Sequence, residues 1–105
     1  MKNLPPFVSN QVESARRYFL NLAAKRDGPL RVVCGGIERT RSDYCIERET
    51  FPYHCLEFVA EGNGMFERHH RTEQISAGSV LCYSPSTPHR ISGDGAGSML
   101  KYYVD

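Results

Sequence analysis

Residues 54–89, HCLEFVAEGNGMFERHHRTEQISAGSVLCYSPSTPH, carry the pattern that decides the fold. Short runs rich in Val, Ile, Tyr and Phe alternate with Gly, Pro and Asn, which is typical of an all-β sandwich or barrel. The stretch predicts four strands, over His54–Glu61, Met65–His69, Thr72–Ser76 and Ser79–Tyr83. Because Gly62-Asn63-Gly64 can supply the positive φ angles of a tight turn, we expect the first two strands to form a hairpin.

The same pattern extends to both sides. It predicts further strands over Leu30–Gly35, Asp43–Arg48 and Met99–Val104, with a short additional strand over His89–Ser92. Pro5-Pro6 predicts an extended arm at the N-terminus. Asn10 as a cap, followed by an apolar stripe of Val12, Ala15, Phe19, Leu22 and Ala23, predicts an α-helix over Asn10–Lys25 that Gly28-Pro29 ends. The sequence therefore predicts an arm and helix in residues 1–29 and one small β-barrel in residues 30–105.

Composition and charge exclude several classes of protein. The chain has 105 residues and a formal net charge of +1, which leaves room for one domain. It has no run of 18 apolar residues and no secretory signal, so we expect a cytoplasmic protein without a membrane segment. Residues 30–105 are slightly acidic, and only Arg16, Arg17, Lys25 and Arg26 come near one another, so the chain alone is not expected to bind nucleic acid.

Metal binding and catalysis have little support from the spacing of candidate residues. Adjacent strand residues point to opposite faces, so His69 and His70 cannot both face one interior site, and one of them should be exposed at a hairpin tip. No H-x-H pair, nucleophile elbow or phosphate-cradling glycine loop occurs. The four cysteines form no C-x-x-C and are expected to be buried, reduced thiols. We therefore expect no metal, no cofactor and no enzymatic activity.

Several segments together resemble the N-terminal sensor domain of AraC-type transcriptional regulators. In that family an apolar strand leads into a G-x-G turn and a short hairpin, and a Gly then begins a strand that ends in a proline-flanked turn and a His. The matching parts here are Leu56–Val59, Gly62-Asn63-Gly64, Ala77–Leu81 and Ser84–His89. The resemblance implies a small cupin-like β-barrel, which can enclose one small ligand between its two sheets.

The resemblance also guides the choice of site residues. Metal-binding cupins carry four ligands, of which only His89 is matched here, so the chain is similar to the metal-free sensor branch. The cupin match turns Cys55, Glu57 and Val59 inward, and it implies a ligand site lined by Cys55, Glu57, Tyr83 and His89. Two alternatives stay open at this point: Glu57 can instead be an outward, solvated carboxylate, and His89 can be a structural residue that caps the turn after Pro88.

The expected function is effector sensing, together with a role in dimerisation as a homodimer. The expected partner is a small-molecule effector, for which a sugar is one candidate. DNA binding would come only from paired helix-turn-helix units beyond Asp105, so the chain is expected to be a fragment of a longer regulator. The first alternative is a small stand-alone cupin enzyme of the isomerase or dioxygenase type. The second is a protein-binding β domain with an unused cup.

Overall fold

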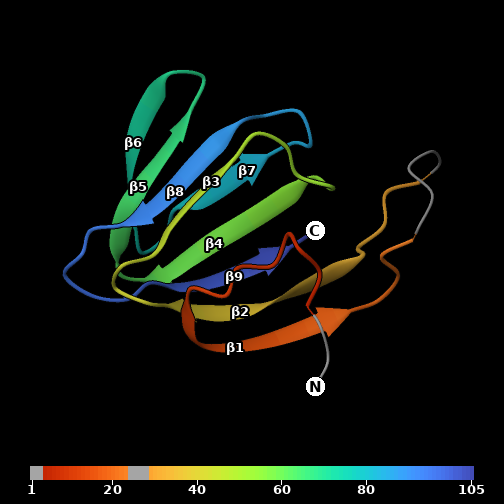
Figure 1. Cartoon of the computed structure of the whole chain (residues 1–105), viewed down its shortest axis with the longest axis horizontal. Coiled ribbons are helices and arrows are strands. Elements are labelled where there is room, and N and C mark those ends of the chain that lie inside the picture. The colour runs from red at the N-terminus through yellow and green to blue at the C-terminus, as the bar shows by residue number, and fades with distance from the viewer. Residues whose placement is uncertain (1–3, 24–28) are drawn as a thin grey trace.

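Two antiparallel sheets make up the structure, a computed structural model that describes residues 4–23 and 29–105 (Figure 1). The larger sheet has the strand order β1-β2-β9-β4-β7, and the smaller sheet has the order β3-β8-β5-β6. The strands are β1 (Val12–Phe19), β2 (Cys34–Thr40), β3 (Cys45–Arg48), β4 (Cys55–Glu61), β5 (Asn63–Arg68), β6 (Arg71–Ser76), β7 (Val80–Tyr83), β8 (His89–Gly93) and β9 (Leu100–Val104).

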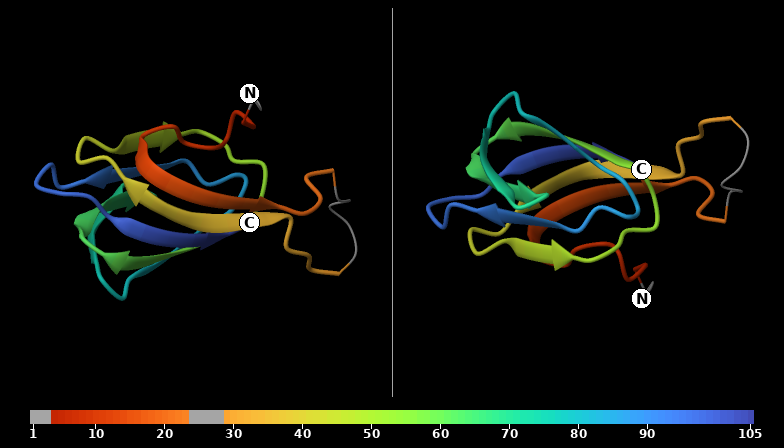
Figure 2. Two further views of the ribbon diagram at one scale, coloured as in Figure 1. Left: turned by 90° about the horizontal axis from the view of Figure 1, so that it is seen from below. Right: turned by 90° about the horizontal axis from the view of Figure 1, so that it is seen from above.

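The sheets lie face to face, as the two views in Figure 2 show, and the core fills the space between them. Alternation along each strand decides which side chains enter this space. In β4, Cys55, Glu57 and Val59 are buried, whereas Leu56 and Phe58 are exposed. The predicted β-barrel is therefore present, and β4 turns inward the set of side chains that the cupin match selected.

The predicted N-terminal helix is wrong. Residues Val12–Phe19 form strand β1, which pairs antiparallel with β2 from Val12 opposite Thr40 to Phe19 opposite Cys34. Ala15 and Phe19 of the proposed apolar stripe are exposed, so the stripe is not a buried face, whereas pairing with β2 satisfies the backbone groups on the facing edges of the two strands. Residues 24–25 of the predicted helix lie outside the described residues. The described part of the chain contains no helix, and hence none that could span a bilayer.

The predicted hairpin between the strands on either side of Gly62 is also wrong, because β4 and β5 belong to different sheets. Gly62 has the positive φ of 94° that the turn prediction required, but it forms a corner where the chain passes between sheets. A Cβ atom at Gly62 would lie 2.5 Å from the carbonyl oxygen of Ser98, so no other residue fits without movement.

The actual hairpin joins β5 to β6 through His69 and His70, whose φ angles are 51° and 60°. Two consecutive left-handed residues make the type I′ turn that suits the twist of paired strands. Both histidines are exposed, which confirms that this pair lies at a hairpin tip.

The expected burial of the cysteines is half correct. Cys34 and Cys55 are buried, whereas Cys45 and Cys82 are exposed, and all four are free thiols. The exposed pair lies at outward positions of β3 and β7, where strand alternation leaves a side chain in solvent.

Candidate functional site

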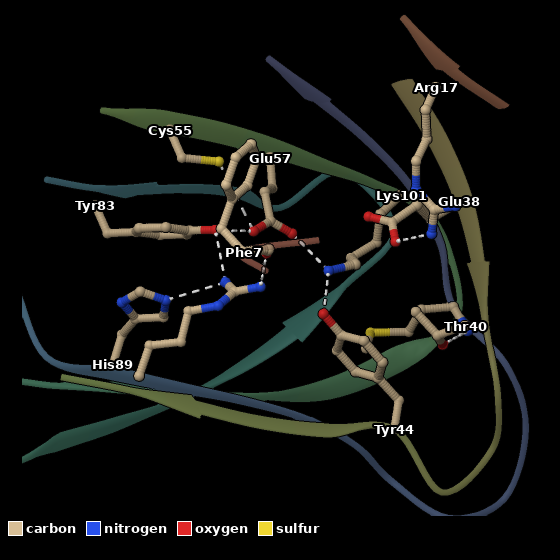
Figure 3. A network of polar contacts seen from close by, with 12 residues as sticks. Phe7, Arg17, Glu38, Thr40, Tyr44, Cys55, Glu57, Tyr83, His89 and Lys101 are labelled. Atoms are coloured by element: carbon tan, nitrogen blue, oxygen red, sulfur yellow. Dashed lines mark hydrogen bonds and ion pairs between the residues drawn. The ribbon is translucent and has the colours of Figure 1, made fainter. Parts of the chain in front are cut away.

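A buried ion pair lies at the centre of the cup between the sheets (Figure 3). Lys101 of β9 donates from Nζ to Glu57 Oε1 of β4 at 2.6 Å, and the two side chains are 1% and 5% exposed. Adjacent antiparallel strands bring both side chains to the inner face, where Lys101 is opposite Val59. Lys101 Nζ also donates at 3.0 Å to the hydroxyl of Tyr44, the residue just before β3, so a second partner holds the ammonium.

The pair keeps both groups charged. Burial by itself would raise the pKa of Glu57, but the Lys101 ammonium, Tyr83 and Arg48 together outweigh burial and lower it. Burial would lower the pKa of Lys101, but the Glu57 carboxylate, with Tyr44 and Glu38, outweighs burial and raises it. Each charge thus compensates for the burial of the other.

The four residues singled out from the sequence lie together. The Tyr83 hydroxyl donates to Glu57 Oε2 at 2.5 Å, and the Cys55 thiol lies 3.9 Å from the same oxygen. The Tyr83 ring stacks on the His89 imidazole with 3.9 Å between centroids. Glu57 is inward, so the alternative of a solvated carboxylate does not describe this structure. Whether these residues bind a ligand stays a prediction.

His89 is tied to the turn before it, as its structural alternative proposed. Its Nδ1 lies 2.9 Å from the Thr87 carbonyl oxygen, which accepts only from a protonated nitrogen, so Nε2 is left as the acceptor of the neutral ring. Arg48 NH1 lies 3.4 Å from that Nε2. Burial lowers the pKa of His89, and the Arg48 charge lowers it further against the opposing effect of the Thr87 contact. His89 therefore enters the network as a neutral acceptor.

Arg48 at the end of β3 extends the network to the N-terminal arm. Its guanidinium donates to the Phe7 carbonyl oxygen at 3.1 Å and lies 3.4 Å from the Tyr83 hydroxyl. Phe7 in turn packs edge-on against Phe51 and Tyr53, with 5.6 Å and 5.4 Å between ring centroids. The arm is thereby held over the same end of the cup.

Two further carboxylates line the cup and are incompletely satisfied. Glu38 Oε2 lies 3.6 Å from Arg17 NH2, beyond hydrogen-bond distance, and Asp105 accepts from the Cys34 thiol only on Oδ2, at 3.3 Å. Glu38 Oε2, Asp105 Oδ1 and Arg17 Nε have no hydrogen-bond partner within the described residues. Burial raises the pKa of both carboxyls, against the lowering effect of nearby cations and thiols.

The cup encloses a cavity of about 20 Å³, which is room for a water or two. Apart from Arg17, the charged groups described above line it, together with part of the arm: Phe7, Val8, Ser9, Glu38, Tyr44, Arg48, Phe51, Cys55, Glu57, Tyr83, Lys101, Tyr103 and Asp105. Arg48 also lines an open surface groove that includes His89, so it stands between the groove and the inner cavity.

The groups that could act as nucleophiles in the cup are held in their protonated forms. Burial and the neighbouring Asp105 raise the pKa of Cys34 to about 12, and burial with Glu57 raises that of Cys55 further. Only a thiolate is an effective nucleophile, so these thiols are inert at neutral pH. Among the described residues no three His, Cys, Asp or Glu side chains are grouped so that they could hold a metal ion.

Sequence reasoning missed several members of the site, above all Lys101. In β9, Leu100, Tyr102 and Val104 form the apolar set that alternation would turn inward, yet the structure turns inward Lys101 and Tyr103. The available signal was the inward Glu57: a buried carboxylate requires a cation, and Lys101 lies on the only strand that supplies a lysine after residue 29. No comparable feature of the sequence marked the other missed members of the site, which are Arg48, Glu38, Tyr44 and Asp105.

Comparison with known proteins identifies the fold. No protein-family model matches the chain, and no curated protein sequence is similar to it. Among solved structures, a cupin superfamily protein from Desulfitobacterium hafniense is similar over 98% of this chain and 88% of its own, with a TM-score of 0.61 and 17% identity. The Cupin_2 domain of an XRE family transcriptional regulator from Enterobacter cloacae matches 68% of this chain and 77% of its own, with a TM-score of 0.59 and 7% identity.

An enzyme is equally similar in backbone. Hydroxypropylphosphonic acid epoxidase from S. wedmorenis matches 70% of this chain with a TM-score of 0.59 and 16% identity, and this match spans 42% of the epoxidase. All these identities are low, so the likeness concerns the fold. The chain has a cupin-like fold, and the fold occurs in a regulator domain as well as in an enzyme.

Proposed function

We propose that this chain is the effector-binding module of a transcriptional regulator of the AraC type, and that a small polar molecule binds in the cup. The observation that carries the proposal is the cavity wall, which combines apolar rings with charged groups fixed by a hydrogen-bond network. Small-molecule sites typically have such a concave, mostly apolar lining with a few placed polar groups.

Binding without chemistry fits the protonation states of the cup. Covalent catalysis by a cysteine or a lysine needs a thiolate or a neutral amine, and general acid-base catalysis works best with a pKa near the operating pH. The Cys34, Cys55 and Lys101 side chains all have raised pKa values and stay protonated at neutral pH. The similarity to a regulator's cupin domain supports the same function.

The N-terminal arm gives the proposed sensor a means of response. Phe7 contributes both a carbonyl oxygen to Arg48 and an aromatic ring to the cluster at the cup's end. A ligand that contacts Arg48 competes with the Phe7 carbonyl and so changes the position of the arm. Occupancy of the cup is thereby linked to the position of an outer segment.

DNA binding is assigned to a separate part of the full regulator. The described residues contain no helix to enter a major groove, and residues 30–105 carry more acidic than basic side chains. In gel-shift assays at matched salt we expect this chain to show no sequence-selective binding to duplex DNA. Selective binding by this chain would contradict the assignment.

Self-association of the proposed module would use the outer face of the larger sheet. Neighbouring strands there expose an apolar row in which each side chain is at least two-fifths exposed: Val80, Leu56, Phe58, Tyr102 and Val104. Two such sheets can pack face to face, and a stable dimer buries about 800 Å² on each partner. Sedimentation equilibrium tests this, with Phe58→Lys expected to shift a dimer to monomer.

The central test is a thermal-shift screen with sugars, sugar acids and amino acids, because a ligand that binds the folded state raises Tm. We expect at least one stabilising compound whose effect is lost in Arg48→Gln and Glu57→Gln. Arg41→Gln is the matched control, since the Arg41 side chain is exposed and its ion pair with Asp43 is exposed as well. A compound that stabilises all four proteins equally would place its site elsewhere and contradict the proposal.

A further inference from the structure

The cup contains a cation that has no carboxylate partner among the described residues. Arg48 has three hydrogen-bonding neighbours, and all are neutral: the Phe7 carbonyl oxygen, the Tyr83 hydroxyl and the neutral His89 ring. The Glu57 carboxylate that lies closest in the network is committed to Lys101 and Tyr83. A guanidinium binds carboxylates bidentately, so Arg48 is an unfilled site for an anion.

The same cavity also contains buried carboxylate oxygens that accept no hydrogen bond from the described residues. Asp105 is 8% exposed, and its Oδ1 accepts no hydrogen bond. Glu38 is equally buried, its Oε2 accepts no hydrogen bond, and its nearest cation, Arg17, stays at 3.6 Å. Both residues line the cavity that Arg48 lines. Buried carboxylate oxygens without donors are costly, so this wall lacks a donor or a cation.

Main-chain carbonyls of the arm occupy the positions where an anionic group would sit. Arg48 NH2 donates to Phe7 O at 3.1 Å, and Arg17 NH2 donates to Ser9 O at 2.8 Å. A carbonyl is a weaker partner for a guanidinium than a carboxylate, because it carries no net charge. The free energy gained when a ligand carboxylate pairs with Arg48 therefore exceeds the free energy lost when the Phe7 carbonyl leaves it.

We propose that the ligand of the cup is a small zwitterion, with a carboxylate that pairs with Arg48 and an ammonium that donates to Asp105. This inference rests on the proposed function and specifies its ligand. The pairing gives each end a charged partner in direct contact, whereas a neutral sugar would hydrogen-bond both ends but leave Arg48 and Asp105 without one. Because the present cavity holds only about 20 Å³, the arm at Phe7–Ser9 has to shift to admit such a ligand.

The test uses a series of probes in which the separation of the two charges increases. Glycine, β-alanine, 4-aminobutyrate, 5-aminopentanoate and 6-aminohexanoate are titrated into the whole chain by calorimetry, with the standard α-amino acids as a second set. Butyrate and butylamine serve as single-charge controls, and arabinose serves as a neutral one. We expect one separation to bind best, at least tenfold tighter than either single-charge control.

Variants at the two ends distinguish the roles of the charges. Arg48→Gln and Asp105→Asn should each weaken the best zwitterion at least tenfold, and Asp105→Asn should leave the weak binding of butyrate unchanged. Asp105→Asn keeps an oxygen that can accept from the Cys34 thiol, so folding should be preserved. Arg41→Gln and Asp94→Asn are exposed controls of the same chemistry and should bind like the unaltered chain.

Each outcome decides between the two proposals. If arabinose or another neutral sugar binds tightly and the zwitterions do not, the cup is a ligand site but its ligand class is wrong. If butyrate binds as tightly as the best zwitterion, and Asp105→Asn has no effect, the proposed contact between a ligand ammonium and Asp105 is wrong. If no probe of any class binds or stabilises the chain, both the zwitterion and the proposed sensing function fail.

Discussion

Replacing Lys101 by Met would leave the Glu57 carboxylate buried without the cation that lies 2.6 Å from it. Removing one partner of a buried ion pair typically costs about 3–5 kcal/mol, because the remaining charge is uncompensated. Both side chains are almost fully buried here, so we expect the upper part of that range. For a domain of this size the corresponding decrease in Tm is on the order of 20 °C.

The pH dependence of the variant provides a second signature. In the unaltered chain the pKa of Glu57 is lowered, so its stabilising contribution is present above the ordinary value of 4.5 and is lost as pH falls through the folded value. Without Lys101, burial raises the pKa of Glu57, and the folded state then binds the proton more tightly than the unfolded state. The stability of Lys101→Met should therefore increase as pH is lowered from 8 toward 5.

Urea unfolding followed by circular dichroism measures both effects, and two comparisons make the result interpretable. Arg41→Met breaks the Arg41–Asp43 pair, which has a similar 2.7 Å separation but is exposed, and should cost no more than about 1 kcal/mol. The double variant Lys101→Met/Glu57→Gln removes the stranded charge and should recover much of the loss. The reasoning is refuted if Lys101→Met costs no more than Arg41→Met, or if its stability is independent of pH.

Three further predictions concern His89, metal content and two glycines. His89 has a lowered pKa in the folded state, so its contribution to stability is present above pH 6.5 and is lost as pH falls. In urea titrations, the stability difference between the unaltered chain and His89→Asn should therefore shrink between pH 7.5 and 5. A constant difference would disprove the assignment of His89 as neutral. Elemental analysis of the purified chain should find zinc, iron and manganese well below one equivalent, whereas about one equivalent that disappears in His89→Ala would favour the enzyme alternative. Gly62→Ala should destabilise the fold by more than about 2 kcal/mol, since the added Cβ would clash with Ser98. At Gly78 an added Cβ meets no atom within 4 Å, so Gly78→Ala should cost only about 1 kcal/mol of backbone strain. Equal losses in thermal unfolding would contradict the close packing of Gly62 against Ser98.

Local alternation was sufficient to place most strands, but the cupin resemblance was needed to choose the inward set that contains Cys55 and Glu57. Each of β4, β6 and β7 has a short run bounded by turn residues, and strand parity decides which side chains face inward once the barrel is assumed. The hairpin tip at His69-His70 followed from the same parity. These features depend on neighbours in sequence, so a single chain reveals them.

The errors arose where distant pairing decides the structure. The segment Val12–Phe19 has a helical stripe, but it pairs with β2 along most of its length, with one irregularity between Val12 and Ser14, and this tertiary pairing outweighs the local preference. Gly62 has the positive φ that suits a hairpin turn, yet β4 and β5 belong to different sheets, so the chain passes from one sheet to the other at this residue. Lys101 was missed because its outward neighbours are apolar and its partner Glu57 is 44 residues away in sequence.

The position of β9 in the larger sheet has a consequence for how the protein is made. This strand lies between β2 and β4, which are synthesised much earlier. One edge of each of these strands therefore stays unpaired until β9 is present. Until residues 100–105 leave the ribosome, Glu57 also has no ammonium to face, and the interior cannot close around it. We therefore expect this domain to stay open until β9 has emerged and then to close slowly, because its sheet depends on pairings between distant segments.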